Sequence, residues 1–129
     1  MKDEEREAYE YNNAMPRNLF KALAEFQQEV PTIHKGTKGY GYTYADLPAI
    51  FEVINPLLKK HGLGFTQLMQ GNNLETIIFH CESGERLTSL AELPQGIELK
   101  GMNAFQVAGS SITYFRRYAL SSALGLVTD

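Results

Sequence analysis

The segment between residues 103 and 126 predicts a helix that is apolar over most of its circumference, and it constrains the fold more than any other stretch. Successive residues lie about 100° apart around a helix, so each face can be assigned from the sequence. One face carries Phe105, Ala108, Ile112, Phe115, Ala119, Ala123 and Leu126. Tyr114, Tyr118 and Val107 lie roughly opposite. Such a helix has to be covered on more than one side, so we expect a sheet on one side and a second helix, a neighbouring subunit or a ligand on another.

Two adjacent arginines interrupt this apolar helix. Arg116 and Arg117 point about 100° apart. Arg117 shares its sector with Ser110 and Thr113, and these side chains form a narrow polar stripe. One interpretation is that each arginine pairs with a carboxylate at the edge of the core. The other is that the planar guanidinium contacts a phosphate, which it matches in geometry. The spacing alone does not decide between these two roles.

The rest of the chain predicts two further helices and a small sheet. Residues 16–30 place apolar side chains at helical spacing and are followed by a proline. A second helix begins after Asp46, a suitable N-cap, and ends at Gly62. From residue 63 the period changes to short runs separated by the turn sequences GNN and ESGE. We therefore predict an α+β fold, in which an antiparallel β-meander packs against the long C-terminal helix and additional helices.

The stretch HKGTKGYGYTY, which precedes the second helix, is rich in glycine, tyrosine and lysine and predicts a loop or a short hairpin. Tyr40, Tyr42 and Tyr44 alternate, so on a strand they would share one face. With Lys35 and Lys38 nearby, they resemble a stacking platform for single-stranded bases. The alternative is that the tyrosines simply pack on the sheet, and without other evidence this is the simpler interpretation.

The charge of the chain is unevenly distributed. The formal net charge is −3, but the first ten residues carry five acids and two bases, so the remainder holds ten of each and is formally neutral. We expect a solvated acidic leader over residues 1–15 and a single core domain over residues 16–129. No apolar run is long enough to span a bilayer. The single cysteine, Cys81, leaves no internal disulfide, and the expected compartment is a reducing cytosol.

The sequence lacks the groupings that enzymes use. His34, His61 and His80 lie far apart without metal-ligand spacing, and no glycine-rich phosphate-binding motif of the nucleotide-hydrolase type is present. A nuclease would need clustered carboxylates for Mg²⁺, whereas the acids here are scattered or confined to the leader. We therefore expect neither a catalytic site, nor a metal, nor a cofactor.

Three stretches of the sequence together resemble a known family. They are AGSSITYFRRYALSSALGLVTD at the C-terminus, YGYTYADLPAIFEVINPLLKKHGLGFTQ in the first half, and SGERLTSLAELP between them. In this order, over roughly residues 17–129, they resemble the Erf (essential recombination function) family of phage single-strand annealing proteins. The most specific part is the helix from Gly109 to Leu126, followed by the segment from Tyr44 to Leu47.

The resemblance implies binding of single-stranded DNA, annealing of complementary strands without ATP in phage homologous recombination, and assembly into rings or helical filaments. It also implies a core similar to that of the ring-forming eukaryotic annealing protein of double-strand-break repair. The expected partners are single-stranded DNA, the annealed duplex and further copies of the chain, in the cytosol of a bacterial host. Full-length members also carry a C-terminal region for partners such as a single-strand binding protein or an exonuclease. This region is missing here, so we expect the chain to have been cut from something longer.

The resemblance also suggests site residues. In the related core, basic residues on the long helix line the DNA groove, and Arg116 and Arg117 occupy the corresponding place. We expect Tyr114, Thr113 and Ser110 to contribute to the same interface, and we infer that the lysine–tyrosine stretch is a second DNA-contacting element. The alternative is an oligomeric protein-interaction module without annealing activity, whose apolar helix docks a partner helix.

Overall fold

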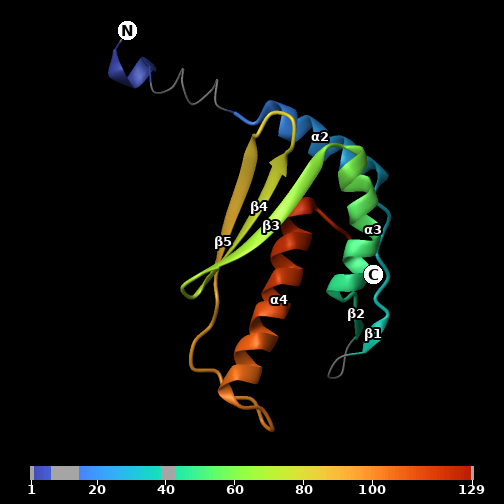
Figure 1. Ribbon diagram of the computed structural model, residues 1–129, viewed down its shortest axis with the longest axis vertical. Coiled ribbons are helices and arrows are strands. Elements are labelled where there is room, and N and C mark those ends of the chain that lie inside the picture. The colour runs from blue at the N-terminus through green and yellow to red at the C-terminus, as the bar shows by residue number, and fades with distance from the viewer. Residues whose placement is uncertain (1, 7–14, 39–42, 129) are drawn as a thin grey trace.

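The computed structural model describes residues 2–6, 15–38 and 43–128, and these residues form an α+β fold (Figure 1). The elements in chain order are α2 (Arg17–Glu29), β1 (Thr37–Lys38), β2 (Thr43–Tyr44), α3 (Leu47–Lys60), β3 (Leu63–Gln70), β4 (Asn73–His80), β5 (Arg86–Glu92) and α4 (Ala104–Leu124). The predicted combination of a sheet, a long C-terminal helix and additional helices is confirmed. No helix in these ranges is long and apolar enough to cross a membrane.

The main sheet is the predicted antiparallel meander, with the strand order β3-β4-β5. Side chains alternate across its two faces, and on β4 Leu74, Thr76 and Ile78 point towards the helices and are buried. On the opposite face Leu68 and Leu90 flank Glu75 in one cross-strand row and are exposed. The sheet is therefore covered by helices on one face only, as Figure 1 shows.

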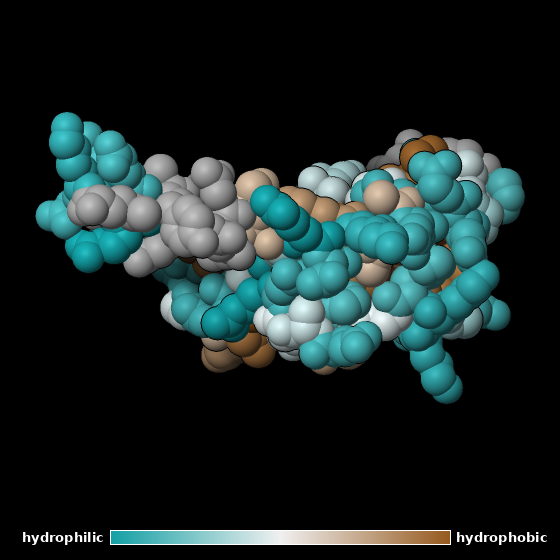
Figure 2. All heavy atoms as spheres, turned by 90° about the horizontal axis from the view of Figure 1, so that it is seen from above, coloured by the Kyte–Doolittle hydropathy of each residue, from teal (hydrophilic) through white to brown (hydrophobic). Residues whose placement is uncertain are grey.

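The two shorter helices are fixed at their ends by specific hydrogen bonds. The Asp46 side chain accepts a hydrogen bond of 3.0 Å from the Ala49 N–H and caps α3, as predicted. Pro16, at the N-cap of α2, provides no side-chain cap. Glu85, from the turn between β4 and β5, accepts a hydrogen bond of 2.9 Å from the Leu19 N–H in its place. The end of the molecule that carries α2 has a mainly hydrophilic surface with small hydrophobic patches (Figure 2).

The long helix α4 begins with a reciprocal capping box between Asn103 and Gln106 and ends at Gly125, whose φ is 69°. Only Val107, Leu120 and Leu124 are buried along its length. The predicted apolar face therefore does not match the buried one, because Phe105 is 89% exposed. The physical reason is that the N-terminal half of α4 extends beyond the sheet (Figure 1), so only Val107 is buried along its first turns.

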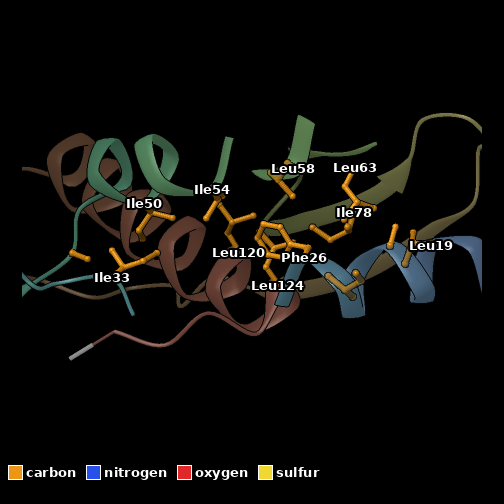
Figure 3. Close-up of a cluster of buried hydrophobic side chains, with 13 residues drawn as sticks. Leu19, Phe26, Ile33, Ile50, Ile54, Leu58, Leu63, Ile78, Leu120 and Leu124 are labelled. Atoms are coloured by element: carbon orange, nitrogen blue, oxygen red, sulfur yellow. The ribbon is translucent and has the colours of Figure 1, made fainter. Parts of the chain in front are cut away.

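The hydrophobic core lies between the covered face of the sheet and the three helices (Figure 3). Its fully buried side chains come from every layer and include Leu19, Phe26, Ile50, Ile54, Ile78, Leu120 and Leu124. The Ile33 N–H donates a hydrogen bond of 2.9 Å to the Val127 carbonyl and joins the segment after α2 to the segment after α4. The C-terminal half of α4 is thereby packed into the core, and it is this half that carries the two arginines.

Candidate nucleic-acid interface

The guanidinium of Arg117 lies among three tyrosine rings. Its carbon Cζ is 4.2 Å from the ring centroid of Tyr44, 5.5 Å from that of Tyr114 and 5.8 Å from that of Tyr118. Tyr114 reaches Arg117 because residues three apart on a helix are neighbours, whereas Tyr44 comes from β2, far away in the sequence. Cation–π contacts of this kind orient the guanidinium and leave its N–H groups able to donate to an anion.

A small hollow opens on one side of the Arg117–Tyr44 pair. Its volume is about 310 Å³, and Lys35, Tyr118, Ser121 and Thr128 line it together with that pair. Two cationic side chains therefore face one space, although they lie 82 positions apart in the sequence. We refer to it as the basic hollow. Two cations and several hydroxyl groups are suitable donors for a phosphate.

A larger hollow opens on the other side of the same pair, with a volume of about 890 Å³. The loop between β5 and α4 contributes Ile97, Leu99 and Met102 to its wall, and α4 contributes Ser110, Thr113, Tyr114 and Phe115. We refer to it as the apolar hollow. Because Tyr44 and Arg117 line both hollows, the two spaces adjoin each other across that pair.

Arg116 lies on the other side of the helix, against the sheet. Its backbone carbonyl accepts a hydrogen bond of 3.0 Å from Gln67 Nε2, and its Nε donates to Gln67 Oε1 at 3.4 Å. The same Gln67 Nε2 donates to Thr76 Oγ1 at 3.0 Å, and Thr76 is almost fully buried. Arg116 therefore links α4 to β3, and it lines neither hollow. Within the described ranges neither arginine pairs with a carboxylate.

The structure thus gathers most of the residues that the sequence suggested, from both predicted segments. Lys35, Tyr44, Ser110, Thr113, Tyr114 and Arg117 surround the two hollows. Lys38 lies on β1, paired with Thr43 of β2, on the hairpin that carries Tyr44 and outside both linings. Tyr40 and Tyr42 lie outside the described residues. Among the described residues, no group of three or more His, Cys, Asp or Glu side chains could hold a metal ion.

Two parts of the interface were missed in the sequence. Tyr118 lines the basic hollow, and its spacing of four residues from Tyr114, next to Arg117, was a usable signal. The other part is the apolar wall formed by Ile97, Leu99 and Met102. No local pattern marks these three residues, because their position depends on how the loop folds back along α4.

Comparison with known proteins yields one match. A family model described as the ERF superfamily matches residues 19–129, which include every element from β1 to α4 and nearly all of α2. No curated protein and no solved structure gives a significant match. The family match confirms the resemblance inferred from the three sequence stretches.

Proposed function

The chain belongs to the ERF superfamily, and on this premise we propose that it binds single-stranded DNA and anneals complementary strands without ATP, as an oligomer, in phage homologous recombination. Membership itself points to a role in recombination by strand annealing. In the proposed activity base pairs form and no covalent bond is broken, so the protein acts by positioning strands and not as an enzyme.

The observation that carries this proposal is the convergence of Arg117, Lys35 and three tyrosines around adjoining hollows. Non-specific binding of a single strand needs cations for the phosphates and aromatic faces for the bases, without a sequence code. Annealing also requires that most Watson–Crick edges stay accessible, and contacts directed at the phosphates leave them so.

Assembly is the second part of the proposal. One subunit offers only two cations to the basic hollow, and its net charge is −3. Repetition of Arg117 and Lys35 around a ring or a helical filament would create a continuous basic line on a slightly acidic protein. We include in this proposal a single core domain from residue 16 onwards and a ring-type assembly like that of the eukaryotic annealing protein.

The competing candidate is an oligomeric interaction module without annealing activity. It is favoured by the exposed apolar side chains at the free end of α4, where Phe105 is 89% and Leu99 48% exposed. It assigns no role to the cluster around Arg117. A module of this kind would assemble without dependence on salt and would have no affinity for DNA.

The test is annealing of two labelled complementary oligonucleotides without ATP or metal, at low and high salt. We expect acceleration that fades with salt, and single-strand affinity whose logarithm falls with log salt by about 0.7 per phosphate contacted. Arg117→Glu should abolish single-strand binding. The control is Arg17→Glu, which reverses an equal charge at an exposed position of α2 and should leave binding intact. If Arg117→Glu bound as well as the parent chain, the interface would be wrongly assigned.

A further inference from the structure

We propose that the apolar hollow holds one unpaired nucleobase, while the phosphate of the same nucleotide lies in the basic hollow. Each subunit would then bind one nucleotide in a site of two parts, divided by the Tyr44–Arg117 pair. This inference rests on the proposed single-strand binding and specifies which part of the strand each hollow contacts.

The arrangement of the two hollows matches the chemistry of a nucleotide. A nucleotide joins an anionic phosphate to a flat, largely apolar base through one sugar. Here a cationic space adjoins an apolar one, and the residues between them supply both a guanidinium and an aromatic ring. A peptide with an apolar side chain would suit the larger hollow alone and would give no reason for the basic hollow beside it.

The apolar wall has a further property that fits a base. Ile97, Leu99 and Met102 are 45%, 48% and 36% exposed, so large apolar side chains face solvent at a hollow. A base that enters would remove their surface from water, which is favourable. The volume of about 890 Å³ has room for a purine or a pyrimidine. The flexible thioether of Met102 can adjust to purines and pyrimidines alike.

The polar groups of the hollow can orient a base without reading a sequence. Thr113 Oγ1 donates its proton to the Gly109 carbonyl at 3.1 Å, so towards the hollow it can only accept. Gln106 Oε1 is engaged by the Asn103 N–H at 2.8 Å in the capping box. The Ser110 hydroxyl, which lines the same space, can donate or accept. This mixed lining tolerates different base edges, as sequence-independent annealing requires.

The consequence is that the protein prefers unpaired strands to duplex. Phosphate contacts alone do not provide this preference. A base in a duplex is stacked and paired, and its removal from the stack costs free energy, whereas an unpaired base enters at lower cost. The hollow therefore distinguishes a single strand from a duplex. When a complementary strand pairs with it, the base has to leave the hollow. Annealing therefore lowers the affinity of the subunit for the duplex product.

The experiment compares two oligonucleotides of equal length, one of thymidines and one of abasic sites, by fluorescence anisotropy with the full chain at several salt concentrations. Both carry the same phosphates and differ only in bases. We expect the abasic strand to bind about 5- to 100-fold more weakly, with the same salt slope. Leu99→Ala and Met102→Ala should weaken thymidine binding and leave abasic binding unchanged. Leu90→Ala, at an exposed leucine on the open sheet face, is the matched control and should change neither.

The outcomes separate the two proposals. Equal affinity for both strands, with a normal salt slope, would overturn the base site and leave the phosphate-binding function in place. If neither oligonucleotide shows salt-dependent binding, the proposed function is overturned and the base site with it. Equal weakening by Leu90→Ala and Leu99→Ala would also overturn the base site, because the effect would then not be confined to the hollow.

Discussion

The two halves of α4 have similar apolar content and very different surroundings. In the C-terminal half, Leu120 and Leu124 are 0% exposed within the core, whereas in the N-terminal half Phe105 is 89% exposed. The difference arises because the sheet ends part of the way along the helix, and only a loop accompanies the first turns (Figure 1). The packed half is held in the core, the projecting half provides apolar surface, and Arg117 lies in the packed half close to the middle of the helix. A candidate site at such a boundary combines a cation on the packed part of the helix with the apolar wall that the preceding loop forms.

The strongest test of this contrast is truncation of one phenylalanine in the core, on α2, and one in the projecting half of α4. Phe26→Ala removes a fully buried ring from the core, and we expect the free energy of unfolding to fall by about 3–5 kcal/mol. Phe105→Ala should change it by less than about 0.5 kcal/mol. Urea denaturation followed by circular dichroism measures both. A large loss for Phe105→Ala, growing with protein concentration, would show that another copy covers the projecting half.

A smaller effect is expected where α4 is anchored to the sheet. Gln67→Ala removes the side chain that links Arg116 to the buried Thr76, and it leaves polar groups without partners. We expect a loss of about 1–3 kcal/mol in unfolding free energy. Gln70→Ala, at the exposed end of the same strand, is the control and should have little effect. The salt slope of single-strand binding should stay unchanged, because Arg117 and not Arg116 lines the basic hollow, where we propose that the phosphate binds. A reduced slope would contradict this separation.

The smallest expected effect is the pH dependence of stability that comes from Glu85, which caps the start of α2, and from Glu29, at its end. Burial raises the pKa of the Glu85 carboxyl, but hydrogen bonds from Leu19, Ser83 and Asn18 outweigh it and hold the pKa below its ordinary value of 4.5. The hydrogen bond from Lys60, at 2.9 Å, likewise lowers the pKa of Glu29. A carboxyl whose pKa is depressed by folding stabilises the folded state above its unfolded pKa. This contribution is lost as the pH falls through the folded pKa.

We therefore expect the melting temperature of the parent chain to fall as the pH is lowered below about 4.5, and to fall less steeply in Glu85→Gln. Glu82→Gln, in the same turn, should keep the steepness of the parent chain. Thermal unfolding between pH 3 and pH 7 gives the comparison. Identical curves for the parent chain and Glu85→Gln would show that the cap on α2 contributes nothing measurable.

Local signals in the sequence account for much of the fold. Asp46 was recognisable as a helix cap, and the meander followed from its turn sequences, because each depends on a few adjacent residues. Which side chains of α4 are buried did not follow from the sequence, since burial depends on where the sheet ends. Spacing alone left the roles of Arg116 and Arg117 undecided, and only the resemblance assigned both to the DNA groove. The pairing of Lys35 with Arg117 and the apolar wall depend on contacts between distant segments, which periodicity does not reveal.

The cluster of rings around Arg117 also gives the protein an optical property. The chain has seven tyrosines and no tryptophan, so its ultraviolet emission comes from tyrosine alone. Tyr44, Tyr114 and Tyr118 contribute to that emission from the candidate site itself. A strand that stacks against these three rings is expected to quench their emission. The unmodified protein can therefore report its own occupancy, without a dye and without an added tryptophan.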